Sequence, residues 1–325
     1  MAILIDATTR IAVRTAFDGH RPRAALQLPV FASNTVAHVP SQDAGGPGTG
    51  HWFLDSLPVF PTLGEAAAAV RANAALIYAS PEHAAEAVVE AIGAGFPLVV
   101  LISEDVHADG RAQIRRALAE SKTVLVGPGA PELVTPDGCQ IGATPSYIFV
   151  RGKIGILSGS GALSREAALQ TSALGLGQSG IVSLDRAPLA ERTFADCLQR
   201  FLDDGETEGI VLLTDGSGRL EETAAALLAA VGRGKPVVAH VGAPQAAPET
   251  PAVAGNVHPL AADVRESKLQ ALRGAGAVIV ESPARIGLAM KSVLDQRESA
   301  RRVRLAASDF VTVMRQVEEE MYCAS

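Results

Sequence analysis

The chain has few cysteines, no concentrated positive charge and no long apolar run. Its three cysteines, Cys139, Cys197 and Cys323, form no C-x-x-C pair, which favours a reduced, cytoplasmic setting. The net charge of −7 is spread without a basic block, so we expect neither nucleic acid nor a membrane as a partner. No apolar run reaches the ~18 residues that span a bilayer. The first residues meet an acid at Asp6 and do not resemble a signal peptide.

The sequence also lacks several motifs that would assign a chemistry at once. Its histidines show no His-x-x-x-His spacing, so we expect no metal site. Gly232-Arg233-Gly234-Lys235 lacks the spacing of a Walker A loop and precedes a strand instead of opening a helix. The spaced glycines of Gly175–Gly180 lie between a helix and a strand, which is the wrong order for a dinucleotide site. No Gly-x-Ser-x-Gly elbow lies between a strand and a helix.

Apolar, β-branched runs alternate with alanine-rich helical segments along most of the chain. The predicted strands are 10–14, 35–39, 75–78, 97–102, 123–126, 153–157, 180–184, 209–213, 236–241 and 277–281. The predicted helices are 63–73, 82–94, 111–120, 162–173, 193–202, 220–231, 264–274 and 286–294. This alternation predicts an α/β fold with mostly parallel sheets flanked by helices.

The number of strands exceeds what one small domain holds, so we expect two domains. The turn-rich segment Thr135–Gly152 marks the joint, which gives domains at 1–145 and 146–296. Two stretches rich in Gly, Pro and Ala, 40–50 and 243–255, predict long loops of the kind that carry function. The tail 297–325 has apolar residues at helical spacing and predicts an amphipathic helix, docked on the body or on a partner.

One strand-to-helix junction indicates an anion site. The apolar run Ile154–Leu157 stops at Ser158, Gly159, Ser160 and Gly161, and a helical run follows at once. Small residues there allow the N-terminus of a helix to present backbone N–H groups and its positive dipole end to a phosphate. The alternative is a tight turn of the kind found in any α/β sheet.

Short motifs recur in a characteristic order from residue 2 to about 295. They are Ile3–Asp6, Leu57–Phe60, Glu90–Gly95, Ile102–Glu104, Gly127–Pro136, Ile156–Gly161, Gly175–Ser179 and Gly234–Val238. In this order the chain resembles the α subunit of succinyl-CoA synthetase (succinate–CoA ligase). The resemblance implies a Rossmann-like CoA-binding domain followed by a flavodoxin-like ligase domain. It further implies an ATP-grasp β subunit that binds the nucleotide, a small carboxylic acid as substrate, and a phosphorylated histidine that carries the phosphoryl group.

The loops that would bind CoA depart from the family pattern. In place of a glycine-rich loop the chain has Phe17, Asp18, Gly19 and His20, which add bulk and a negative charge; His20 could still offer a cationic donor. The segment Asp43–Gly46 lacks the family's lysine.

One element of the CoA site is kept. Ile102, Ser103 and Glu104 end a strand, where ligands gather in such sheets. The alternative is that Glu104 only caps the next helix. The resemblance therefore implies a CoA site that is possible but weakened.

The catalytic loops depart from the pattern as well. Val253 stands at the position of the phosphohistidine, and the nearest histidine is His258. Asp215 stands where the family has the glutamate that orients this histidine, and it keeps a carboxylate on a shorter arm. Glu132 replaces a glycine of the family, and Arg165 replaces a tyrosine. The resemblance thus assigns catalytic roles to Asp215 and, after a change of loop length, to His258.

Three functions remain open from the sequence. The first is an acid–CoA ligase subunit that uses His258 or forms the acyl phosphate directly. The second is an acyl or carbamoyl phosphate transferase without the phosphohistidine, in which the turn of Ser158–Gly161 holds the substrate phosphate. The third is a non-catalytic paralogue that assembles with a partner subunit and regulates it.

Overall fold

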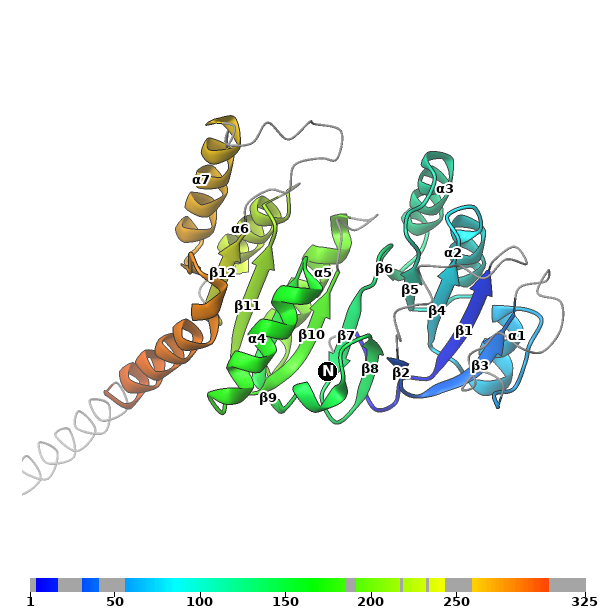
Figure 1. Ribbon diagram of the computed structural model, residues 1–325, viewed down its shortest axis with the longest axis horizontal. Helices are drawn as coiled ribbons and strands as arrows, with labels where there is room; N and C mark the ends of the chain where they lie inside the picture. Colours follow the sequence, from blue (N-terminus) through cyan, green and yellow to red (C-terminus); the bar gives the residue numbers. More distant parts are fainter. Residues whose placement is uncertain are drawn as a thin grey trace, which may run out of the picture.

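The structure of the protein is a computed structural model. The structure describes residues 4–16, 31–40, 56–184, 191–216, 219–231, 234–242 and 259–303. Within these ranges the chain forms two β-sheets with helices packed on them, which Figure 1 shows side by side. The first sheet is blue and teal in that view, and the second is mostly green. The predicted α/β class, with parallel sheets flanked by helices, is confirmed.

The first sheet is wholly parallel and has the strand order β3-β1-β4-β5-β6. Its strands are β1 (Ile11–Ala16), β3 (Thr35–Val39), β4 (Ala74–Ala79), β5 (Leu98–Ile102) and β6 (Val124–Val126). β4 and β5 are buried along their whole length, which explains why they read as continuous apolar runs. Helices α1 (Leu63–Val70), α2 (Ala84–Gly93) and α3 (Ala108–Ala119) pack on one face of this sheet.

The second sheet has eight strands in the order β13-β12-β11-β9-β10-β7-β8-β2. The parallel part consists of β9 (Arg151–Ser158), β10 (Gln178–Ser183), β11 (Gly209–Thr214), β12 (Val237–Val241) and β13 (Val278–Ile279). The antiparallel edge consists of β7 (Glu132–Thr135), β8 (Cys139–Gly142) and β2 (Phe31–Ala32). A short strand from the first part of the chain thus completes the second sheet.

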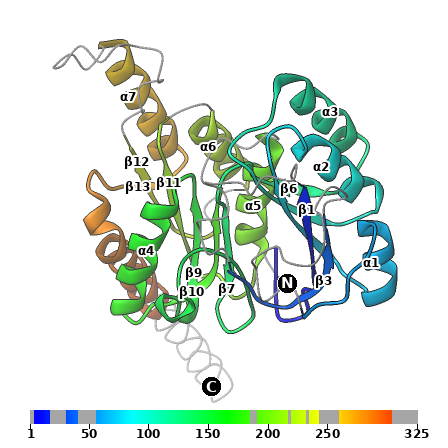
Figure 2. The same ribbon diagram turned by 45° about the vertical axis from the view of Figure 1, so that its right-hand side comes forward.

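Helices cover both faces of the second sheet. Helix α4 (Gly161–Ala173) and the helix at 286–303 lie on one face, with Ile156 and Ile181 beneath them. Helices α5 (Glu191–Asp203), α6 (Leu220–Val231) and α7 (Pro259–Gly274) lie on the other. The turned view in Figure 2 shows α5 between the two sheets. Its Phe194 and Phe201 are fully buried in a core that also includes the first sheet.

The segment predicted as the domain joint is built into the second sheet. Thr135–Gly152 contains the turn and second strand of the β7–β8 hairpin and the short 3-10 helix η1 (Ser146–Ile148). The hairpin was not predicted because its strands are short, and because their partners, β10 and β2, lie far away in the sequence. The boundary at residues 145 and 146 stays a prediction.

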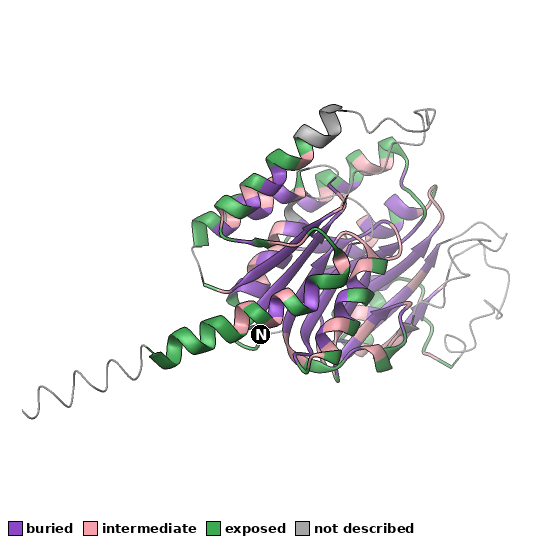
Figure 3. Cartoon of the chain, turned by 60° about the vertical axis from the view of Figure 1, so that its left-hand side comes forward, coloured by how far each residue is buried: buried purple, intermediate pink, exposed green. Residues whose placement is uncertain are grey.

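The last described helix leaves the body of the molecule. Residues 295–303 are all exposed, and Figure 3 shows them as a green segment that projects from the purple core. The predicted helix at 297–325 is helical and exposed over its described part, 297–303, where Arg297 donates to the carbonyl of Gly234 at 2.9 Å. The rest lies outside the described residues, so the docking of this helix stays a prediction. A search of the described residues for a helix long and apolar enough to cross a membrane found none.

Candidate functional site

The carboxyl ends of two neighbouring strands enclose the candidate site. β9 and β11 are paired in parallel, and the helices that follow them, α4 and α6, lie on opposite faces of the sheet. In α/β sheets a crevice opens at such a point, where successive connections leave in opposite directions, and ligands bind there. The turn of Ser158–Gly161 and the turn that begins at Asp215 both lie at this crevice.

The turn after β9 forms the N-terminus of α4 as predicted. Ser160 is the N-cap, and its Oγ accepts a hydrogen bond from the backbone N–H of Leu163 at 3.5 Å. The buried Ser158 donates from Oγ to the carbonyl oxygen of Ser160 at 2.7 Å and accepts from its N–H at 3.0 Å. Since the first four N–H groups of a helix have no acceptor within the helix, those of Gly161 and Ala162 face outward as anion donors.

Space remains at this turn. A methyl group added at Gly159 or Gly161 would meet no atom closer than 3.8 Å and 4.0 Å, respectively. Neither glycine has a positive φ. Neither clash nor backbone conformation therefore requires glycine here, which fits a turn kept open for a ligand.

A buried hydroxyl group lies beside the same helix end. Ser183 is fully buried at the end of β10, and its Oγ has no hydrogen-bond partner among the described residues. The atom that a side chain at Gly161 would approach first is this Oγ. Buried hydroxyls are usually paired, so this one marks a place where a further polar group fits. No local pattern marks Ser183, because only the strand pairing brings it to α4.

Asp215 directly follows β11 and is half-buried. Gly216 has φ +76°, a left-handed conformation that favours glycine, so the chain turns sharply after Asp215. The N–H of Gly242, just after β12, donates to the carbonyl of Thr214 at 2.8 Å. The N–H of Gly159 donates to the carbonyl of Leu213 at 2.8 Å, so the end of β11 that carries Asp215 lies next to the turn of Ser158–Gly161. Val253 and His258 lie outside the described residues.

Glu132 and Arg165, the two departures from the family pattern, lie near each other. Glu132 is buried on β7, opposite Ser183 on β10, and its Oε1 accepts from the backbone N–H of Thr144 at 3.0 Å. Burial raises the pKa of the Glu132 carboxyl, while the hydrogen bonds from Thr144 and the positive charge of Arg165 oppose that rise. Gly142 leaves room for the Glu132 side chain, since a Cβ there would lie 2.6 Å from its Cγ.

The predicted CoA residues of the first sheet are described only in part. Ile102 is buried at the end of β5, Ser103 is buried and donates from Oγ to the carbonyl of Asp105 at 2.8 Å, and Glu104 is exposed. The alternative role of Glu104 as a helix-capping acid is wrong, because α3 begins at Ala108. Phe17, Asp18, Gly19 and His20 follow β1 and lie outside the described residues.

The motifs set aside in the sequence have structural roles. Lys235 precedes β12, and its Nζ donates to the carbonyls of Phe201 and Asp204 at the C-terminal end of α5, so this lysine has a structural role. The glycines of Gly175–Gly180 connect α4 to β10. His240 is buried on β12, with Nδ1 3.0 Å from the carbonyl oxygen of Val280. In the parts of the chain that the structure describes, no cluster of three or more His, Cys, Asp or Glu side chains could hold a metal ion.

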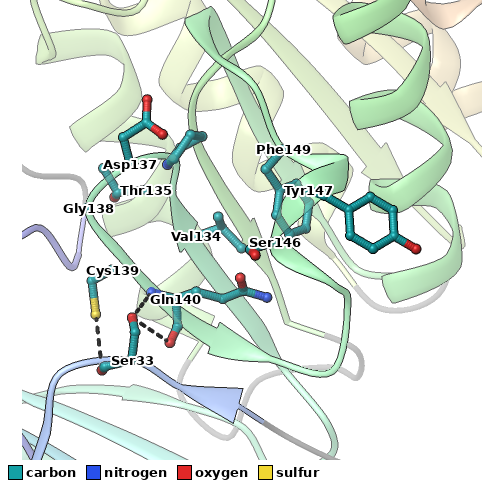
Figure 4. Close-up of a pocket in the computed structure, with 11 residues that line it drawn as sticks. Ser33, Val134, Thr135, Asp137, Gly138, Cys139, Gln140, Ser146, Tyr147 and Phe149 are labelled. Atoms are coloured by element: carbon teal, nitrogen blue, oxygen red, sulfur yellow. Dashed lines mark hydrogen bonds between the residues drawn. The ribbon is translucent and has the colours of Figure 1, made fainter.

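A cavity of about 410 Å³ lies at the opposite end of the second sheet. It is lined by the β7–β8 turn with Asp137, by η1 with Tyr147, and by Ser33 and Cys139 (Figure 4). Because β7 runs antiparallel to β10, this turn lies at the amino end of β10, away from Ser158–Gly161. None of the predicted site residues within the described ranges lines it, so the cavity is separate from the candidate site.

Comparison with solved structures supports the architecture. ATP citrate lyase from Methanothrix soehngenii, solved in complex with citrate and coenzyme A, matches with a TM-score of 0.69 over 91% of this chain and is 21% identical. The chain spans about half of that protein, 51%. The dinucleotide forming acetyl-coenzyme A synthetase 1 of Ca. Korarchaeum cryptofilum matches with a TM-score of 0.56, 18% identity, and 83% of this chain against 58% of that one. At these identities the likeness concerns the fold alone.

Sequence comparison is more specific. Residues 151–292 match the succinyl-CoA ligase like flavodoxin domain, and residues 31–105 match the CoA binding domain. The succinate–CoA ligase [ADP-forming] subunit alpha of Aquifex aeolicus is 34% identical over 297 residues, which cover 90% of this chain and 95% of that protein. Subunit alpha 1 of Archaeoglobus fulgidus is 32% identical over 87% and 94%. The chain therefore belongs to the family of succinate–CoA ligase alpha subunits.

Proposed function

We propose that the chain is the α-type subunit of an acid–CoA ligase in the cytoplasm. It would form an acyl-CoA from a small carboxylic acid and CoA, together with an ATP-grasp β subunit that binds the nucleotide. The observation that carries this proposal is that the adjacent carboxyl ends of β9 and β11 bring together two features. The N-terminus of α4 follows β9, and Asp215 follows β11. Family membership supports the same reaction class.

The reaction has two transfers. The phosphoryl group passes from the nucleotide to the substrate carboxylate, either through the imidazole of His258 or directly, and the nucleoside diphosphate leaves. The sulfur of CoA then attacks the carbonyl carbon of the acyl phosphate, phosphate leaves with its bonding electrons, and the thiol proton is released. At the crevice, the N–H groups of Gly161 and Ala162 and the dipole of α4 would stabilise the phosphate charge. Asp215 would orient the group that carries the phosphoryl group.

CoA would enter from the carboxyl edge of the first sheet as a substrate. Phe17–His20 follow β1 and Ile102–Glu104 lie at the end of β5, so both segments are at this edge. The Ser103 hydroxyl donates to the carbonyl of Asp105 and the Ser103 carbonyl accepts from the N–H of Gly129, so the hydroxyl oxygen would contact CoA as an acceptor. The exposed carboxylate of Glu104 repels the CoA phosphates, so we place it toward the pantetheine arm.

The proposal is tested in two steps. The first is isothermal titration of CoA into the purified chain, with phosphate present and absent, where micromolar binding is expected. The second is nucleotide-dependent CoA consumption with a β chain, compared between wild type and Asp215→Ala. Glu208→Gln, at the amino end of β11, is the matched control.

Each outcome separates the candidates. Loss of CoA consumption in Asp215→Ala alone supports the ligase. Normal turnover in both Asp215→Ala and His258→Ala contradicts it. Absence of CoA binding together with stabilisation by carbamoyl phosphate favours the transferase, and a bound partner without ligase activity favours the regulatory paralogue.

A further inference from the structure

A buried ion pair lies behind the turn that carries Asp215. Lys268 on α7 and Glu221 in the first turn of α6 have side chains that are 4% and 0% exposed, with Nζ 3.1 Å from Oε2. Lysine and glutamate are rarely buried this deeply, because both lose their hydration. Such a pair can often be replaced by apolar residues without loss of stability, so its presence calls for another role.

Lys268 has a second acceptor. Its Nζ donates to the backbone carbonyl of Gly216 at 2.7 Å. Gly216 follows Asp215 directly and has φ +76°. An ammonium group bonded to a buried carbonyl makes a strong, charge-assisted hydrogen bond. The backbone carbonyl of the residue after Asp215 is therefore held by a side chain 52 positions away in the sequence.

The other side of Asp215 is fixed from a different element. The carbonyl of Thr214 accepts from the N–H of Gly242, and the carbonyl of Leu213 accepts from the N–H of Gly159, both at 2.8 Å. β11 is thus tied to the end of β12 and to the anion-binding turn. Helix α7 joins this arrangement at two carbonyls, that of Gly216 through Lys268 and that of Val241 through Arg265.

We propose that Lys268, with its charge balanced by Glu221, is a positioning residue that fixes the backbone of the turn carrying Asp215 next to the turn of Ser158–Gly161. Helix α7 begins at Pro259, the residue after His258, so the same lysine ties the helix that follows His258 to Asp215. The catalytic meaning of this positioning rests on the proposed function, but the positioning itself does not.

The test removes both charges together, so that no unpaired charge stays buried. Two double variants of the full chain are made, Lys268→Met/Glu221→Leu and Lys268→Met/Glu221→Gln. Hydrogen exchange is measured on peptides that cover 212–216 and 237–242. We expect about tenfold faster exchange in these peptides, with native protection kept in β9. The control is Lys153→Met/Glu208→Gln, which removes an ion pair at the amino ends of β9 and β11 and leaves this exchange unchanged.

Kinetics with the β chain add a second readout. In the double variants kcat falls about tenfold while KM for CoA stays within about twofold, because Asp215 is misplaced but the CoA edge is intact. Lys268→Arg, which keeps a charged donor, restores part of the rate.

Three results are distinguished. Unchanged exchange at 212–216 overturns the proposal, whether or not the chain is active. Global loss of protection in both variants also overturns it, since the pair then supports the whole fold and not one turn. Faster local exchange in a chain whose wild type lacks ligase activity supports the positioning and contradicts the proposed function instead.

Discussion

The two ends of the parallel strands in the second sheet are built differently. At the amino ends, side chains bond to other protein groups. Lys153 pairs with Glu208 at 2.8 Å, and Lys235 donates hydrogen bonds to backbone carbonyls at the C-terminal end of α5. At the carboxyl ends, the turn of Ser158–Gly161 leaves N–H groups and space open. The hydroxyl of Ser183 there has no hydrogen-bond partner among the described residues.

At the amino ends the polar groups are used for contacts within the protein, whereas at the carboxyl ends some of them are left for a ligand. Charged groups at the amino ends are exposed, and their ion pairs contribute little to stability. The buried pair Lys268–Glu221 lies behind the carboxyl ends, where it constrains backbone. The cavity of about 410 Å³ at the amino end of β10 is not the site that this contrast indicates.

The largest effect is expected from removing the carboxylate of Asp215, which lies at the carboxyl end of β11. Asp215→Ala is expected to lower nucleotide-dependent CoA consumption at least ~100-fold, since a positioned acid–base or orienting group contributes about that much. Glu208→Gln, at the other end of the same strand, should keep the wild-type rate. The measurement is a CoA-consumption assay with the β chain. Equal losses in both variants would remove the distinction between the two ends.

Stability provides the second contrast. Lys268→Met leaves Glu221 buried and unpaired, so we expect a loss of about 3–5 kcal/mol in the free energy of unfolding. Lys153→Met removes an exposed pair and should change it by no more than ~1 kcal/mol. Urea denaturation of both variants measures the difference. Similar losses would mean that burial does not separate the two pairs.

The open turn itself can be filled. If phosphate at ten times its Kd binds the N-terminus of α4, the wild-type Tm should rise by about 2–4 °C. Gly161→Val places a side chain next to Ser183 and should remove most of that rise. The control is Gly205→Val, because Gly205 is exposed and a Cβ there meets no atom within 4 Å. A full phosphate shift in Gly161→Val would place the anion elsewhere.

The smallest effect concerns the pH dependence of stability. Burial raises the pKa of Glu132 above its usual value near 4.5, so the folded chain holds this proton to a higher pH than the unfolded chain does. Stability therefore falls as the pH rises from the unfolded to the folded pKa. Glu132→Gln keeps an oxygen for the N–H of Thr144 and lacks this fall. Its Tm relative to wild type should increase from pH 4 upward, and a constant difference would contradict the assignment.

Much of the parallel architecture could be predicted from local pattern. The predicted segments 35–39 and 220–231 coincide with β3 and α6, because buried strands and amphipathic helices differ in the spacing of their apolar residues. The turn at Ser158–Gly161 was found for a similar reason, since an apolar run that stops at small residues before a helix is a local signal. Asp215 was found by resemblance, at the end of a predicted strand.

The sequence by itself determined the order of the parallel strands and the helices, the turn of Ser158–Gly161 and the family. Only the tertiary structure decided that β7, β8 and β2 complete the second sheet, that Ser183 lies beside the N-terminus of α4, and that Lys268 reaches Gly216. The physical reason is distance along the chain. Periodicity and capping act between residues a few positions apart. Strand pairing and buried ion pairs join segments whose separation leaves no mark in the local pattern.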